Sequence, residues 1–319
     1  MKKNRLNIPQ KERRQQKITE KNNKNSGEKK QPFLTTADYT SLIKISFKKL
    51  EDNPLLFAPN GLMLLFSLLF ALGLLYTTGI LHLIFTIPVI LTKPMYLSTA
   101  IHALMAANPF KFWGSIVLYL ALEFFMTLFF ITAKYGMIKD VLLVGKTSLR
   151  QGMAFGKKHL LDVIDIYFFS FLLIFVPISA LIAIGVFILP FSLIGGIVTL
   201  GLFILLGIIY AGFMIYRLVF VYPIMAFERE GPMKSIRDDF HYVKTHISHT
   251  FITWLVLIGM ATVYGIMKSP LEVLRGVVHN GYMVIILTGV ILLLEVLVST
   301  WEHIFIFKAY LSGKHRNKY

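Results

Sequence analysis

The sequence predicts an all-α integral membrane protein with six transmembrane helices in three hairpins, each preceded by an amphipathic interfacial helix. Of its 319 residues, 55% are hydrophobic and 16% are charged, whereas soluble domains carry ~25% charged residues. The hydrophobic residues also form long blocks, and ~20 of them in a helix cross the hydrocarbon core. Helices are expected there because each helix satisfies its own backbone hydrogen bonds without water.

Residues 1–35 are predicted to be a disordered basic tail on the cytoplasmic side. Residues 1–30 contain eleven Lys and Arg against three Glu, a composition that buries too little apolar surface to offset the entropy of ordering. Aromatic residues do not interleave with these charges, which argues against binding of nucleic acid. The transmembrane domain is then expected over residues 36–312, followed by a short basic cytoplasmic end at 313–319.

Six apolar blocks predict the transmembrane spans. The first block continues toward Leu91, which is too long for one straight helix, so we expect it to end or kink near Pro88. The predicted spans are 61–86, 112–133, 163–184, 193–216, 249–267 and 282–307.

The positions of Lys and Arg predict the orientation. Twenty-nine of them lie in residues 1–50, in the 134–162 and 217–249 connections and after Phe307, whereas the alternate connections hold only four. Cytoplasmic loops carry an excess of Lys and Arg. The bias therefore predicts a multi-pass protein of the cell membrane with both termini in the cytoplasm.

Two basic connections share a pattern that suggests an internal repeat. Ser148-Leu149-Arg150 and Ser235-Ile236-Arg237 lie 87 residues apart, and a weaker third copy, Ser46–Leu50, precedes the first span. The alternative is that any basic amphipathic helix before a span gives this pattern. Such helices are predicted within 36–52 and 139–160, in the plane of the membrane surface. Their basic residues would attract anionic lipid headgroups; the candidates are Lys48, Lys49, Arg150, Lys157, Arg237 and Lys244.

The stretch from Tyr222 to Arg237 carries a family resemblance. It contains Pro223, an apolar run, Glu230, Gly231-Pro232 and then a basic amphipathic helix that leads into a span. With Phe47–Leu50 and Asn53-Pro54, it resembles the six-span prokaryotic membrane proteins of unknown function that include the membrane domain of glycerophosphoryl diester phosphodiesterases. The resemblance covers about residues 36–312 and implies the six-span architecture. Because the catalytic barrel of those phosphodiesterases has no counterpart here, we expect no hydrolase activity.

Two acidic residues lie near the middle of predicted spans, Glu123 in the second and Glu295 in the sixth. A charged group at the bilayer centre costs a few kcal/mol, so such residues usually face the interior of the bundle. One hypothesis is that both carboxylates converge on a substrate, an ion or a proton path. The alternative is that each is protonated or bonded to a hydroxyl of a neighbouring helix and fixes packing.

Other features of the sequence point to no catalytic or metal chemistry. The chain has no cysteine, which excludes disulfides, thiolate metal sites and Cys nucleophiles. His241, His246 and His249 lie near Asp238 and Asp239 but match no compact metal motif. We therefore expect no metal and no cofactor. The glycines of the fourth span are expected in helix packing, with a moving transporter helix as the alternative.

Three functional hypotheses follow in this order. The first is a non-catalytic membrane protein that binds lipids or a membrane-protein partner through its basic amphipathic helices. The second is a transporter or channel that uses Glu123 and Glu295. The third is a membrane-embedded enzyme, for which the sequence offers only isolated intramembrane acids.

Overall fold

The computed structural model describes residues 36–86, 94–278 and 281–316, and all regular structure within them is helical. The predicted basic tail at 1–35 and the predicted break near Pro88 lie outside the described residues. Within the described residues, six helical segments are long and apolar enough to cross a membrane, as predicted. They are Pro54–Thr77, Pro109–Val144, Leu149–Ile188, Leu193–Glu228, Ile247–Val277 and Gly281–Lys314.

The helices follow one another with short connections. In chain order they are α2 (Thr36–Glu51), the 3-10 helix η1 (Pro54–Phe57), α3 (Ala58–Thr77), α4 (Ile80–Thr86), α5 (Pro94–Ala107), α6 (Pro109–Val144), α7 (Leu149–Ile188), α8 (Leu193–Arg217), α9 (Val221–Glu228), α10 (Pro232–Thr245), α11 (Ile247–Val277) and α12 (Gly281–Arg316).

The start of each of three long helices is set by a side-chain cap. Asn108, Ser148 and Ser192 accept hydrogen bonds from backbone amides three residues later, at the starts of α6, α7 and α8. Such caps satisfy one of the amides that a helix start leaves unpaired. Gly145 ends α6 with a left-handed φ of 87°, a conformation that glycine adopts without a steric cost. The predicted interfacial helix at 139–160 is therefore divided by a turn, and its two parts continue α6 and α7.

Three of the helices are longer than a bilayer is thick. α6 and α12 have 36 residues and α7 has 40, which at a rise of ~1.5 Å per residue gives about 54–60 Å. The hydrocarbon core is only ~30 Å thick. The predicted spans were shorter because they counted apolar residues alone, whereas the polar segments continue the same helices out of the membrane.

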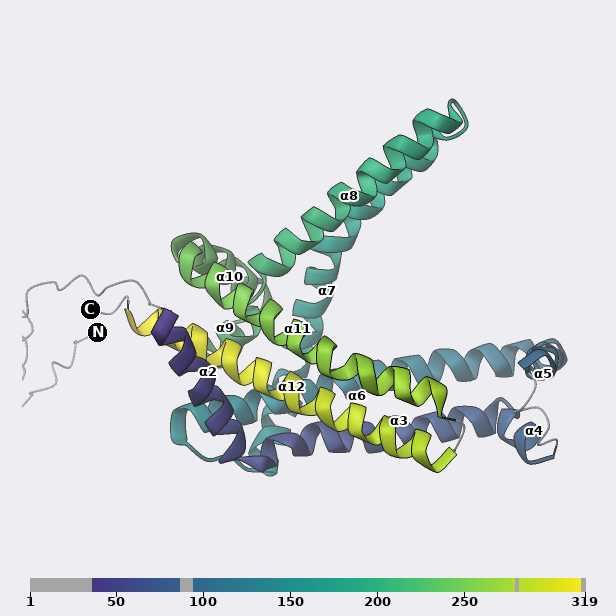
Figure 1. Ribbon diagram of the computed structural model, residues 1–319, viewed down its shortest axis with the longest axis horizontal. Helices are drawn as coiled ribbons and strands as arrows, with labels where there is room; N and C mark the ends of the chain where they lie inside the picture. Colours follow the sequence, from purple (N-terminus) through teal and green to yellow (C-terminus); the bar gives the residue numbers. More distant parts are fainter. Residues whose placement is uncertain (1–35, 87–93, 279–280, 317–319) are drawn as a thin grey trace, which may run out of the picture.

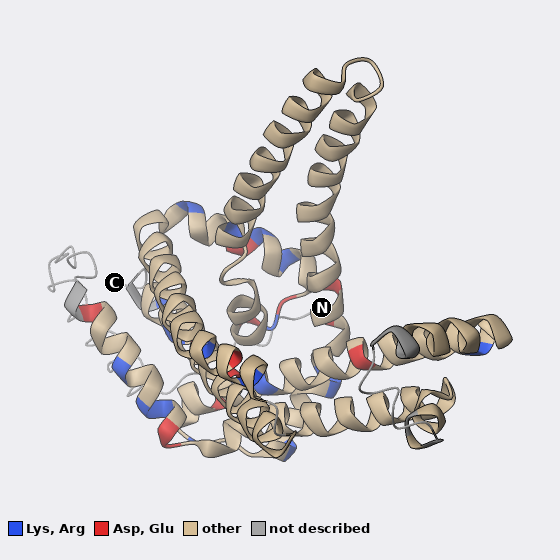
Figure 2. Ribbon diagram, turned by 45° about the vertical axis from the view of Figure 1, so that its right-hand side comes forward, with Lys and Arg blue, Asp and Glu red and all other residues tan. Residues whose placement is uncertain are grey.

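The long helices pack in pairs that diverge from one end (Figure 1). α3 packs along α6, α7 along α8, and α11 along α12. The α7/α8 pair projects away from the other two pairs in both views (Figures 1 and 2). We call the common end the junction. It comprises α2, α9 and α10 with residues 132–141 of α6, 149–166 of α7 and 301–310 of α12.

The hydrophobic core of the protein lies in this junction. The largest fully buried side chains come mainly from α6, α9 and α12, and among them are Met137, Ile138, Ile224, Met225, Ile304, Phe305 and Phe307. No charged residue occurs between Asp165 and Arg217, and most large apolar side chains on the outer part of α7 and α8 are exposed. The outer pair therefore presents an apolar surface suited to lipid.

Glycines allow α6 and α7 to approach closely where they cross in the junction. A Cβ atom added at Gly136 would lie 2.5 Å from Phe155, and one at Gly152 would lie 2.4 Å from Met137. Small residues permit this kind of close helix packing. In the glycine-rich α8, by contrast, a Cβ at Gly201 or Gly212 would have no atom within 4 Å.

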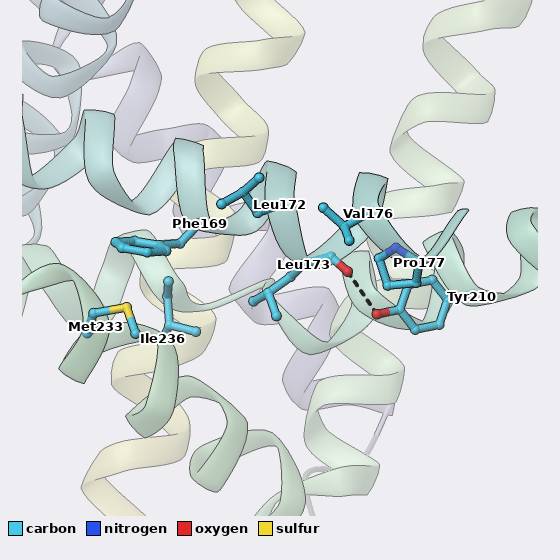
Figure 3. A pocket seen from close by; sticks show the side chains of 8 residues that line it. All are labelled: Phe169, Leu172, Leu173, Val176, Pro177, Tyr210, Met233 and Ile236. Carbon is cyan, nitrogen blue, oxygen red and sulfur yellow. Dashed lines mark hydrogen bonds between the residues drawn. The ribbon is translucent and has the colours of Figure 1, made fainter. Parts of the chain in front are cut away.

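A proline in α7 is compensated by a tyrosine of α8 (Figure 3). Pro177 has no N–H, so the carbonyl of Leu173, four residues earlier, loses its helical donor. The hydroxyl of Tyr210 donates to that carbonyl at 2.8 Å. Pro177 and Tyr210 line an apolar groove of about 390 Å³ between α7, α8 and α10. One hydrogen bond across the pair thus satisfies the carbonyl that Pro177 leaves without a donor in α7.

Tyr210→Phe is expected to destabilise the protein by about 0.6–2 kcal/mol, the range for hydrogen bonds between membrane helices. In a Pro177→Ala background the cost should be smaller, because the new N–H of residue 177 can bond to Leu173. A double-mutant cycle on unfolding free energies in mixed micelles measures this coupling. Equal costs of Tyr210→Phe in both backgrounds would contradict the compensation.

Candidate functional site

The two predicted intramembrane acids belong to different helix pairs. Ser67 of α3 donates a hydrogen bond to Glu123 Oε1 at 2.5 Å, and Tyr264 of α11 donates to Glu295 Oε2 at 3.5 Å. Glu123 Oε2 is buried without a hydrogen-bond partner among the described residues. Each carboxylate thus bonds to a hydroxyl within its own pair, the arrangement that the packing alternative describes.

The six predicted surface residues all lie on the junction (Figure 2). Lys48 and Lys49 lie on α2, Arg150 and Lys157 on the first turns of α7, and Arg237 and Lys244 on α10. Five of the six are exposed, and Lys49 is half-buried. Arg237 also forms an ion pair with Asp238 at 3.8 Å, but its side chain remains exposed, so the charged groups of the exposed residues can reach a ligand or headgroups.

One histidine of the predicted cluster, His249, connects neighbouring helices through hydrogen bonds. Its Nδ1 lies 2.6 Å from the hydroxyl of Tyr39 on α2, and its Nε2 lies 3.0 Å from the carbonyl oxygen of Ala309 on α12. The ring therefore ties three helices together. Within residues 36–86, 94–278 and 281–316, no group of three or more His, Asp or Glu is placed to hold a metal ion.

A cavity of about 510 Å³ opens between the α7/α8 pair and the α11/α12 pair, at the edge of the junction. Ligand pockets typically have ~300–1,000 Å³. The apolar wall consists of Ile174, Ile215, Leu218, Val219, Val221, Pro223, Trp254, Leu257, Ile258, Ala261, Ile306 and Phe307, and the polar end consists of Tyr135, Ser170, Tyr222, Glu302 and His303. A largely apolar pocket with a few converging polar groups is the usual form of a small-molecule site.

The polar end of this cavity is held in place by hydrogen bonds around His303. Its Nδ1 lies 2.5 Å from the carbonyl oxygen of Ser299, so Nδ1 carries a proton and donates it there. Its Nε2 then accepts from the hydroxyl of Tyr135, 3.3 Å away. The ring of Tyr135 also packs against those of Tyr222 and Phe307. The cavity therefore has a fixed polar end and an apolar wall.

Two buried lysines of α6 lie in the junction and differ in their partners. Lys139 donates to the carbonyl oxygen of Ala226 at 2.6 Å. Lys134 is only 2% exposed, yet among the described residues no carboxylate lies within 4 Å of its Nζ and no hydrogen bond reaches it. Its charge acts on Glu302 and His303, both at the polar end of the cavity. Sequence reasoning missed Lys134, because its position in a predicted basic connection marks it only as one of several loop cations.

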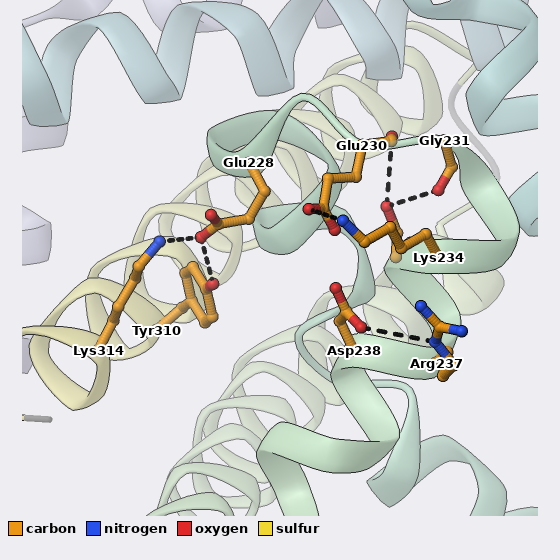
Figure 4. Close-up of polar contacts among 9 residues, drawn as sticks. Glu228, Glu230, Gly231, Lys234, Arg237, Asp238, Tyr310 and Lys314 are labelled. Carbon is orange, nitrogen blue, oxygen red and sulfur yellow. Dashed lines mark hydrogen bonds and ion pairs between the residues drawn. The ribbon is translucent and has the colours of Figure 1, made fainter.

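An acidic corner of the junction is neutralised by basic neighbours (Figure 4). Glu228 at the end of α9 accepts hydrogen bonds from Lys314 and, at 2.8 Å, from Tyr310 of α12. Lys234 donates to Glu230 at 2.5 Å, and this hydrogen bond lowers the pKa of Glu230. Because the acids have basic partners, we interpret this corner as a set of contacts that join α9, α10 and α12.

Asp239 of α10 is fully buried under the start of α9. Neither of its carboxylate oxygens has a hydrogen bond of good geometry among the described residues. The nearest donors are the backbone amides of Phe220 and Val221, and Arg217 acts from the end of α8. Burial raises the pKa of Asp239 well above its usual value, although the amides and Arg217 oppose this rise. The folded protein therefore favours the protonated form of Asp239.

No protein-family model, no curated protein and no solved structure matches this chain.

Asp239→Asn is expected to stabilise the protein at alkaline pH. The raised folded pKa means that stability is fully present below the unfolded value of about 3.9 and is lost as the pH rises through the folded pKa. Asparagine keeps an acceptor for the amides of α9 and carries no charge. The apparent Tm of the variant minus that of the wild type, measured in detergent, should be near zero at pH 4 and positive at pH 8.

Asp239→Leu is the matched control, because it removes the charge and the acceptor together. We expect it to be less stable than Asp239→Asn at every pH, since the amides of Phe220 and Val221 would lose their nearest acceptor. An Asp239→Asn variant that is less stable than the wild type at pH 8 would show that the carboxylate is ionised and stabilising in the fold.

Proposed function

We propose that this chain is a non-catalytic, multi-pass membrane protein that binds anionic lipid headgroups through the exposed basic residues of the junction. The observation that carries the proposal is the position of these residues. They surround the end at which the apolar helices converge, whereas residues 166–216 of the projecting pair contain no charge. As part of the proposal, we also keep the resemblance of the chain to the membrane domain of glycerophosphoryl diester phosphodiesterases, which implies the six-span architecture.

The surface of α2 supports the proposal because apolar and basic side chains are exposed side by side. Ile45 and Phe47 are exposed, and Lys44 and Lys48 lie next to them. A helix with this surface can bury its apolar side chains at the acyl boundary while its lysines reach the headgroups. The opposite face, with Tyr39 and Leu42, is buried against the junction, so α2 would link the protein core to the lipid.

The transport hypothesis has less support. It needs Glu123 and Glu295 to act on one path, and each of them bonds within its own helix pair. We therefore expect Glu123→Gln and Glu295→Gln to leave lipid association unchanged.

The test neutralises three exposed residues of the junction, Lys157, Arg237 and Lys244, by substitution with Gln. Each basic residue near an anionic surface contributes about 1 kcal/mol, so the triple variant should bind phosphatidylglycerol up to about a hundredfold more weakly. Native mass spectrometry of the purified full chain with titrated phosphatidylglycerol and phosphatidylcholine measures the change. Binding of phosphatidylcholine should not change.

The matched control removes three basic residues at the other ends of the spans, Lys111, Lys268 and Arg275. Lys268 is already paired with Glu272 at 3.2 Å, so this variant should retain phosphatidylglycerol nearly as well as the wild type. An equal loss in the two triple variants would reduce the effect to net charge and would contradict a specific role of the junction.

A further inference from the structure

The cavity at the edge of the junction contains polar groups without partners. Among the described residues, no hydrogen bond or ion pair reaches the carboxylate of Glu302 or the hydroxyl of Tyr222, both of which line it. Lys134 does not itself line the cavity and is only 2% exposed, but it precedes the lining residue Tyr135 and lies close enough to act electrostatically on Glu302. The polar atoms of Glu302 and Tyr222 are not fully buried, so they are accessible to a ligand in the cavity.

The two charges at this end have opposite signs but do not pair with each other. Lys134 and Glu302 are close enough to influence one another, yet their nitrogen and oxygen atoms are more than 4 Å apart, since they form no ion pair. A buried charge without a counter-charge costs several kcal/mol. A ligand with one negative and one positive group can satisfy both residues at once, whereas a purely anionic ligand would be repelled by Glu302.

The apolar wall of the cavity indicates what is attached to the charged group of the ligand. Ile215 of α8 and Trp254, Leu257 and Ile258 of α11 extend from the polar end along helices that are predicted to cross the membrane. Tyr135 follows the predicted end of the second span at residue 133, and Glu302 precedes the predicted end of the sixth at residue 307. The polar end therefore lies at headgroup depth, and the wall at acyl-chain depth.

We propose that this cavity is a binding site for one phospholipid with a zwitterionic primary-amine headgroup. Its phosphate approaches Lys134, its ammonium approaches Glu302 and Tyr222, and an acyl chain lies along the wall between α8 and α11. Phosphatidylethanolamine has this chemistry. The site is distinct from the exposed basic surface of the junction, with which it shares no residue, so each can fail without the other.

The experiment offers three lipids with identical acyl chains to the purified, delipidated full chain and counts bound molecules by native mass spectrometry. The probes are phosphatidylethanolamine, phosphatidylcholine, whose quaternary ammonium has no N–H, and phosphatidylglycerol, which has no amine. We expect one phosphatidylethanolamine per chain to be retained about tenfold more tightly than either of the others, a difference of ~1.4 kcal/mol. Equal retention of the three lipids would overturn the proposal.

Variants of Glu302 and Lys134 test which residue binds the ammonium and which binds the phosphate of the lipid. Glu302→Gln should abolish the preference for phosphatidylethanolamine over phosphatidylglycerol, and Lys134→Met should weaken the retention of both lipids. Lys157→Gln, on the exposed surface, should leave the single retained phosphatidylethanolamine unchanged. A preference that survives Glu302→Gln would overturn the assignment of the ammonium.

A bulky substitution in the apolar wall of the cavity tests the site independently if a variant at the polar end fails to fold. Ala261 of α11 is exposed and lines the cavity, so Ala261→Trp can fill the space of the acyl chain without touching Glu302 or Lys134. We expect this variant to lose the retained phosphatidylethanolamine while its apparent Tm in detergent stays within a few degrees of the wild type. Undiminished retention in a folded Ala261→Trp protein would place the lipid elsewhere and overturn the site.

Discussion

Hydrocarbon cannot hydrogen-bond to a peptide group or solvate a charge, and this constraint governs the whole structure. Helices that cross it must satisfy their own backbone, and three of them, α6, α7 and α12, are about twice as long as the core is thick. The polar parts of α6, α7 and α12 meet at one end of the molecule, and we infer that this end lies outside the hydrocarbon core. The junction contains the buried core of the protein, its exposed basic residues and the polar end of its cavity, and the outer helix pairs are largely apolar.

In and beside the junction, several polar groups are satisfied by partners from distant parts of the chain. Lys139 bonds to the carbonyl of Ala226, and His249 joins Tyr39 to Ala309. Lys134 and Asp239 differ from these residues, because neither has a hydrogen bond of good geometry among the described residues. Asp239 can be accommodated by protonation, because its neighbours are backbone amides and its pKa is raised. Lys134 lies beside a cavity that contains the unpaired carboxylate of Glu302. A bound ligand with one negative and one positive group would satisfy both residues.

The sequence predicted the six crossing helices because each is an apolar block of sufficient length. It did not predict that α6 continues past Ala133 and that α7 begins before Val163, because the polar, amphipathic pattern of 139–160 indicated a separate interfacial helix. Nor could it predict the cavity, whose polar end joins Tyr135 to His303 across 168 residues. The prediction that Glu123 and Glu295 are intramembrane acids did not extend to their hydrogen-bond partners, Ser67 and Tyr264, because no local pattern marks these two residues.

The central claim, that the junction lies outside the membrane while α7 crosses it, can be tested with single cysteines, because the chain has none of its own. Lys157→Cys lies in the junction, Val176→Cys halfway along α7 and Phe191→Cys at the tip of the α7/α8 pair, and all three native side chains are exposed. A membrane-impermeant maleimide applied from either side of native membranes should label residue 157 from one side only, residue 191 from the other side only and residue 176 from neither. Labelling of residues 157 and 191 from the same side, or of residue 176 from either side, would contradict the account.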